Sequence, residues 1–297
     1  MKKQYLLLML FGFGITSNAQ DYVDIVKLSS NNATLENGTN SETQVNNLNF
    51  EIYYPKEIND NLVLITGLTA ENTSLNLVPL AEKSNITMTR LNLGVKYKHS
   101  EKWSGTYVLL PKLASDFNAN GSKNFQFGAI AVLDYTVSES FKYKMGLYSS
   151  TENFGTTLTP IIGLWHKSKN KKLYINATLP IRMDVNYSLA DKFSLGADLL
   201  TSVKSYNVES DAYVQEESIR FGFYAQYRLM KNALLLRAKL GYDTTDYGLY
   251  NQNDQVGLQV LTFQVGGDDR NRLNTEFLAA PYFGADLIYR FDLSNRK

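Results

Sequence analysis

Apolar and polar residues alternate along this chain in runs of roughly ten positions, and many runs end in an aromatic residue beside a short polar turn. In the clearest run one parity is apolar or small, and its members are Phe125, Phe127, Ala129, Ala131, Leu133 and Tyr135. A period of two indicates a β-strand, because successive side chains point to opposite faces. Runs of roughly 9–11 residues are also long enough to cross a bilayer as tilted strands.

The spacing of aromatic residues around the turns sharpens this interpretation. Tyr97 and Trp103 enclose five residues, and two further pairs of aromatics repeat this spacing. An even separation across a tight hairpin is compatible with both rings on the outer face, where they would form one girdle at headgroup depth. The alternative is a soluble β-meander with aromatics at its turns. The predicted periplasmic girdle comprises Tyr54, Tyr97, Trp103, Tyr135, Phe141, Trp165, Tyr187, Phe193, Tyr227 and Phe291.

The N-terminus resembles a secretory signal. Lys2 and Lys3 precede an apolar run that ends at Ile15, and Ser17-Asn18-Ala19 fits the small-x-small cleavage rule. We therefore expect a signal peptide at residues 1–19 and one barrel domain at residues 20–297. No other stretch approaches the ~20 apolar residues of a membrane-spanning helix, so strands would have to cross the bilayer. The chain has no cysteine, which excludes disulfides and a lipidated N-terminal cysteine.

The strands can be counted. The predicted fold is an all-β, transmembrane, antiparallel up-and-down barrel of about 14 strands, with 12 as the alternative. The count depends on Leu179-Pro180, which is interpreted as a tight turn because proline cannot donate a hydrogen bond to a strand ladder. The expected strands are 22–29, 44–54, 62–69, 86–98, 103–113, 124–136, 141–150, 156–165, 172–179, 181–187, 193–204, 218–228, 233–244 and 281–292. Residues 205–217 and 245–280 are expected to be outer loops, the second holding a strand-like run at Val256–Val265 that could extend the wall, form a hairpin or fold into the lumen.

The closing strand carries a second signal. Phe283, Ala285, Leu287, Tyr289, Phe291 and Leu293 share one parity, as in the C-terminal strands recognised by the barrel-assembly machinery. Three further segments carry a family resemblance: residues 110–116, Phe154-Gly155 with Pro160 to Trp165, and Leu179-Pro180 followed by Tyr187 and Lys192-Phe193. With these, the chain resembles an uncharacterised outer-membrane β-barrel family of Gram-negative bacteria, a domain of unknown function. The resemblance implies a barrel and no assigned activity.

The inward parity is where function would reside. Its candidate charged residues are Lys96, Lys142, Lys144, Arg182, Asp198, Arg220, Arg237, Lys239, Asp286 and Arg290. Basic residues exceed acidic ones in this set, which favours a water-filled lumen that prefers anions. The alternative is a closed interior, in which Asp286 pairs with Arg237 or Lys239, and Asp198 pairs with Arg182 or Arg220.

Composition limits the function classes. A formal net charge of +1 implies no field for nucleic acid or another polyanion. His99 and His166 are the only histidines, and neither has a partner motif for hydrolysis or for a metal, so we expect no enzyme, no cofactor and no metal site. The expected protein is an outer-membrane channel or transporter for a small solute, in contact with outer-membrane lipid. The alternative is a structural barrel whose outer loops bind a protein or a glycan.

Overall fold

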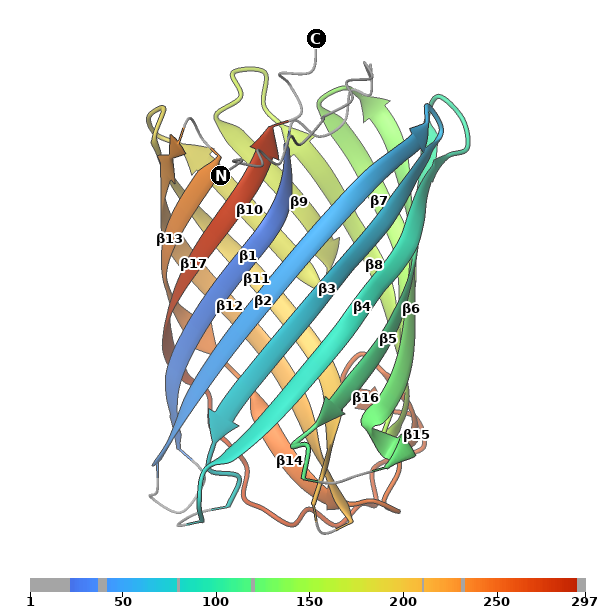
Figure 1. The fold of residues 1–297 in the computed structure, drawn as a ribbon, viewed down its shortest axis with the longest axis vertical. Helices are drawn as coiled ribbons and strands as arrows, with labels where there is room; N and C mark the ends of the chain where they lie inside the picture. The colour runs from blue at the N-terminus through green and yellow to red at the C-terminus, as the bar shows by residue number, and fades with distance from the viewer. Residues whose placement is uncertain are drawn as a thin grey trace, which may run out of the picture.

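The computed structural model describes residues 22–36, 42–78, 81–118, 121–209, 211–230 and 233–292, and shows a closed barrel (Figure 1). The predicted signal peptide and Leu293 lie outside these residues. The barrel wall consists of β1 (Tyr22–Glu36), β2 (Glu42–Asn59), β3 (Leu62–Leu75), β4 (Ser84–Lys98), β5 (Trp103–Ser115), β6 (Phe125–Ser138), β7 (Phe141–Glu152), β8 (Gly155–Lys167), β9 (Leu173–Leu179), β10 (Arg182–Ser188), β11 (Phe193–Val208), β12 (Ala212–Leu229), β13 (Leu234–Asp243) and β17 (Ala280–Asp292).

Each wall strand pairs antiparallel with its neighbours, and β1 closes the ring by pairing with β17 from Tyr22–Asp292 to Ala33–Tyr282. The predicted count of 14 strands is confirmed. The tight turn at Pro180 is also confirmed, since Thr178 of β9 pairs with Arg182 of β10. With an even number of strands both ends of the barrel chain lie at the short-turn end, which is the periplasmic end of bacterial barrels.

The outward face is apolar, as a lipid-facing surface requires. Exposed side chains such as Leu93, Leu109 and Met145 form a band, and near the short turns exposed Tyr54, Tyr97 and Tyr187 border it. No helix among the described residues is long and apolar enough to cross a membrane. The other predicted girdle residues except Trp165 also have outward parity, and they are Trp103, Tyr135, Phe141, Phe193, Tyr227 and Phe291.

Trp165 does not belong to this girdle. Its side chain is only 7% exposed, and it shares a register row with inward Lys142, whereas His166 pairs with outward Phe141. The prediction placed Trp165 outward from its spacing to the following turn. A shift of one residue moves every side chain of a strand to the opposite face. The turn at 168–172 is longer than the tight turns from which the faces of the other aromatic residues were predicted.

The wall has an uneven height. β2 and β12 have 18 residues each, whereas β9 and β10 have seven. The outer half of β8 therefore lacks β9 as a partner, and β15 (Gly257–Val260) pairs with it in parallel. Similarly, β14 (Asp246–Asn251) pairs with the outer half of β12, and β16 (Phe263–Gln264) forms a hairpin with β15. A single 3-10 turn, η1 (Ser122–Asn124), precedes β6. The segment expected as a loop at 245–280 thus completes the wall at the long-loop end.

The end of the β11–β12 hairpin is buried on both faces and is not the solvated loop expected at 205–217. We call residues 205–209 and 211–216 the hairpin tip. Tyr206 and Val214 on one face join a buried apolar cluster with Leu35, Leu75 and Ile86, which point inward from β1, β3 and β4. The tip crosses the lumen far enough for Asn207 to pair in parallel with Ser115 of β5. The outer end of the barrel is therefore filled by an apolar core.

The assignment of faces predicts opposite responses to the same charge. Leu93→Arg points into lipid near the middle of the apolar band, so the free energy of unfolding should fall by ~2–4 kcal/mol. Ile65→Arg on the neighbouring strand lines the internal cavity and should cost much less. The measurement is urea unfolding in lipid vesicles. Equal losses for both variants would contradict the assigned parity.

Candidate functional site in the barrel lumen

The lumen contains a cavity of about 1260 Å³ that begins at the short-turn end. Its lining reaches the turn residues Asp60, Ser100 and Glu101, so the cavity communicates with the periplasmic side. At the other end it stops at Glu71 and Lys204, beyond which the apolar core fills the barrel. All of the candidate lumen residues except Lys144 line this cavity, namely Lys96, Lys142, Arg182, Asp198, Arg220, Arg237, Lys239, Asp286 and Arg290.

A β-bulge shapes the mouth of the cavity. The register between β1 and β17 shifts at Ile25, so that Tyr22 and Asp24 lie on the inward side although simple alternation would turn them outward. Asp24 accepts a hydrogen bond of 2.5 Å from the Nε atom of Arg290, and the Arg290 guanidinium lies 3.5 Å from the centroid of the Tyr22 ring. The bulge thus adds an aromatic ring and a carboxylate to the lumen that period-two reasoning missed.

Opposite walls touch across the lumen at several depths. At the mouth, the rings of Tyr22 on β1 and Tyr174 on β9 have centroids 5.5 Å apart. Deeper, Arg182 of β10 lies 3.8 Å from Glu51 of β2. At the inner end, the ammonium group of Lys204 on β11 lies 2.7 Å from Glu71 on β3 and 3.2 Å from Glu216 on β12. These contacts bring β9–β11 against β1–β3 and separate the wall formed by β4–β8 from the wall formed by β12, β13 and β17.

The β12–β13–β17 wall is a network of paired charges. Arg237 lies 3.1 Å from Asp184, and its guanidinium stacks on Tyr224. Lys239 bridges Asp198 at 2.5 Å and Asp286 at 3.7 Å. Around these groups three more inward cations are paired, namely Lys27 with Asp286, Arg220 with Asp243 and Arg290 with Asp24, whereas Arg228 donates to the Asp191 carbonyl oxygen and the Ser188 hydroxyl. On this wall the arrangement matches the salt-bridged interior that the sequence left as the alternative, although Asp198 pairs with Lys239 and not with the arginines.

Several inward carboxylates were missed from the sequence. Glu71, Glu152 and Glu216 lie outside the predicted strands, but the observed strands continue past the predicted ends and keep the inward parity. The alternation Thr69, Glu71, Thr73 and Leu75 was the available signal for β3. With these acids and Asp24 included, most of the predicted excess of inward positive charge is compensated.

The β4–β8 wall contains inward lysines that form no ion pair with the described residues. Lys96 lies 4.0 Å from Asp134, but no carboxylate of the described residues forms an ion pair with Lys142 or Lys144. Lys144 donates instead to the amide oxygen of Asn176 at 2.7 Å, and the Lys142 ammonium lies 5.6 Å from the centroid of the Trp165 ring. Among the described residues, the cluster of Lys96, Lys142 and Lys144 therefore places three ammonium groups beside one carboxylate, Asp134.

The hairpin tip is anchored by polar contacts on its second face. Glu152 of β7 accepts hydrogen bonds from the backbone N–H of Ser205 at 2.7 Å and from its hydroxyl at 2.9 Å, and its other oxygen binds Lys112. Gln126 also donates to the Ser205 hydroxyl, and Asn207 donates to Asn124. Because these partners lie on β5–β7 and on η1, the tip is tied to the wall opposite its own strands.

The segment at 245–280 holds the tip from the outside. The Arg270 guanidinium donates to the Tyr213 hydroxyl at 2.9 Å and stacks on Tyr250 at 4.1 Å. It also binds Asp268, and these hydrogen bonds hold the pKa of the Asp268 carboxyl below its usual range. Gly266 and Gly267, with φ values of 96° and 95°, form the turn that returns the chain to this contact.

Neither histidine lies in the cavity lining. His99 contacts the Tyr107 hydroxyl at 2.9 Å and His166 contacts the Ser140 carbonyl oxygen at 3.0 Å, both near the short turns. Among the described residues no group of three metal-binding side chains comes together.

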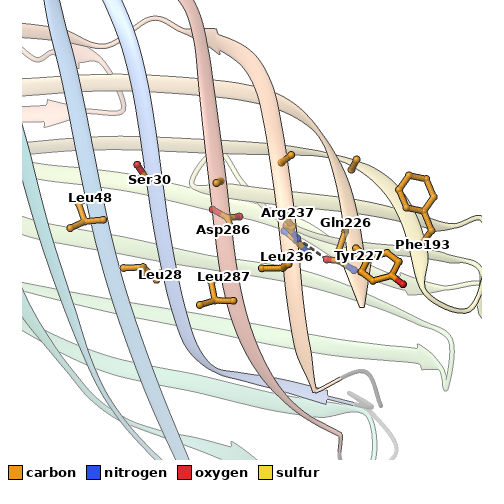
Figure 2. A pocket seen from close by; sticks show the side chains of 13 residues that line it. Leu28, Ser30, Leu48, Phe193, Gln226, Tyr227, Leu236, Arg237, Asp286 and Leu287 are labelled. Atoms are coloured by element: carbon orange, nitrogen blue, oxygen red, sulfur yellow. Dashed lines mark hydrogen bonds between the residues drawn. The ribbon is translucent and has the colours of Figure 1, made fainter. Parts of the chain in front are cut away.

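A second hollow of about 570 Å³ lies on the lipid-facing side of β2, β1, β17, β13 and β12 (Figure 2). Short side chains at Ser30, Ala225, Ala238 and Ala285 leave it open, and larger ones such as Leu48 and Leu287 surround it. Its lining is apolar and faces the hydrocarbon layer, so lipid chains are the expected filling.

Residues 17–254 match the family described as a domain of unknown function, DUF6268, and the chain belongs to this family. No curated protein matches its sequence significantly.

Among solved structures, the COG4313 outer membrane channel from Pseudomonas putida F1 has 10% identity and a TM-score of 0.48, covering 95% of this chain and 100% of its own. The Pseudomonas putida toluene transporter TodX has 11% identity and a TM-score of 0.38, covering 89% and 87%. The KdgM porin has 9% identity and a TM-score of 0.36, covering 89% and 99%.

The role of Glu152 as anchor of the tip gives a stability prediction. Glu152→Gln removes the charge that binds Lys112 and leaves that buried ammonium unpaired, so unfolding should become easier by ~3–5 kcal/mol. Glu101→Gln is the matched control, because its carboxylate is exposed beside Lys98, and it should change stability by less than about 0.5 kcal/mol. Thermal unfolding in detergent compares the two. Indistinguishable midpoints would show that Glu152 does not hold the tip.

Proposed function

We propose that this outer-membrane barrel is a gated channel for small solutes, with the hairpin tip as its outer gate. The observation that carries the proposal is the polar cavity of about 1260 Å³, which is reached from the periplasmic end and stops at the tip. A barrel that serves only as a scaffold has no need of an enclosed polar chamber. A channel that is closed at rest has this form.

The way in which the tip is held supports a movable gate. Its second face is bound by hydrogen bonds to Glu152, Gln126 and Asn124, and water can replace these bonds when the tip leaves. Its apolar face must separate from Leu35, Leu75 and Ile86, which disfavours the open state. Opening is therefore expected to be infrequent, with brief conducting events.

A cross-link can lock the gate. Asn207 and Ser115 are paired residues of adjacent strand segments, whose Cα atoms lie roughly 5 Å apart, and this spacing suits a disulfide. The chain has no cysteine of its own. The variant with Ser115→Cys and Asn207→Cys should be silent in planar bilayers when oxidised, and a thiol reductant should restore the brief openings.

The single variants Ser115→Cys and Asn207→Cys are the controls, and both should conduct like the parent under oxidising conditions. Equal conductance of the oxidised and reduced double variant would reject the hairpin tip as the gate. A parent barrel that never conducts, with or without the reductant, would reject the channel itself.

The second candidate is a binding role for the outer surface. It is favoured by apolar side chains on the 245–280 segment, where Phe263 is 72% exposed and Val265 is 54% exposed. Such side chains beside β15 could bind a protein or a glycan. Phe263→Ser with Val265→Ser would then remove binding while conductance stays unchanged.

A further inference from the structure

We propose that the β4–β8 wall of the cavity binds the negatively charged group of a small anionic solute between Lys142 and Lys144, with Lys96 as the third cation. The inference rests on the proposed channel function and names its class of solute. The ligand group is a carboxylate or a phosphate carried by a molecule small enough to enter the cavity.

The first argument is the contrast between the walls. Ion pairs neutralise most of the inward cations elsewhere in the described lumen, and the cations with carboxylate partners are Lys27, Lys112, Arg182, Lys204, Arg220, Arg237, Lys239 and Arg290. Arg90 is attracted to Glu51, and Arg228 donates to the Asp191 carbonyl oxygen and the Ser188 hydroxyl. Lys142 and Lys144 are the inward lysines of the wall strands for which the described residues supply no ion pair. The lysine charge without a counter-charge on the wall strands is thus concentrated at one place.

The second argument is burial. Lys142 is only 8% exposed, and a buried ammonium group without a counter-charge is unfavourable. Among the described residues, Asp134 is the carboxylate that attracts Lys142 and Lys144, and Lys96 already lies 4.0 Å from it. Three positive charges against one negative charge leave a local excess of two. A mobile anion from solution would supply the missing charge.

The third argument is the shape of the surroundings. The Trp165 ring stands beside Lys142, and Tyr174 packs against its edge with ring centroids 6.3 Å apart. Tyr22 continues this row of rings across the mouth. Aromatic walls exclude water from one side of the cluster, which strengthens its attraction for an anion. The amide of Asn176, already bound to Lys144, adds a polar neighbour on β9.

The position of Trp165 makes the site measurable. The chain has two tryptophans, and Trp103→Phe leaves Trp165 as the only one. Iodide is a small anion that quenches tryptophan fluorescence on contact, whereas acrylamide is a neutral quencher. In the full barrel in detergent, Lys142→Gln with Lys144→Gln should lower the iodide quenching constant by roughly fivefold, because close charge pairs are lost. The acrylamide constant should stay the same.

Inorganic phosphate should compete with iodide in the parent and have little effect in the double variant. Lys27→Gln is the matched control, since it removes a paired inward lysine from the opposite side, and it should leave iodide quenching unchanged. Lys142→Arg with Lys144→Arg keeps both charges and should keep the enhancement. The arginine variant also shows whether a folded barrel with altered side chains at these two positions still binds iodide.

Equal iodide constants in the parent and the glutamine variant would overturn the site, and so would quenching that phosphate does not reduce. The measurement is made at equilibrium and needs no transport. A barrel that binds iodide at Lys142 and Lys144 but never conducts would therefore refute the channel and leave the anion site standing. A barrel that conducts but does not bind iodide at Lys142 and Lys144 would refute the anion site and leave the channel standing.

Discussion

The backbone of a strand in a bilayer has no water to bind, so each of its N–H and C=O groups must find a partner in the protein. Here the pairing of β1 with β17 meets this requirement by leaving no free edge in the ring. Closure with 14 strands creates an interior too wide for the wall side chains alone to fill. The rest of the structure shows how this interior is occupied.

The two ends of the lumen are occupied differently. At the outer end, the inward faces of β1–β5 change from polar to apolar residues, and the hairpin tip supplies Tyr206 and Val214 to complete a core. At the periplasmic end, the side chains stay polar and most charges are paired, which leaves a solvated chamber. Glu71 and Lys204 mark the boundary between the two regions, because their ion pair joins β3 to β11 across the lumen.

The sequence was sufficient to predict the strands of the barrel wall, because its period of two indicates which side chains face lipid. Leu93 and Met145 are outward for the same reason that Lys96 and Lys144 are inward. The lumen was less predictable, since alternation does not say which opposite strand a side chain meets. The bulge at Ile25 could not be seen from the pattern, and it turned Asp24 inward.

The hairpin tip was mistaken for a loop for a related reason. Residues 205–217 are polar in part, and solvent was the obvious partner for Ser205 and Asn207. Their partners are in fact Glu152 and Asn124, which lie far away in sequence on another part of the ring. Long-range polar contacts of this kind leave no local signal. The ten predicted lumen charges identified the right surface, but only the ion pairs of the folded barrel show that Lys142 and Lys144 differ from the other predicted cations.

The central claim is a polar chamber open to the periplasm and closed to the outside, and accessibility from each side tests it most directly. Asn49 lines the deep part of the cavity, so Asn49→Cys can be probed with a membrane-impermeant thiol reagent. Asn118→Cys near the outer end of β5 and Ser100→Cys in a short turn report the two sides of the membrane. We predict that intact cells label only Asn118→Cys, and that permeabilised outer membranes label all three. Labelling of Asn49→Cys in intact cells at the rate of Asn118→Cys would contradict the closed outer end.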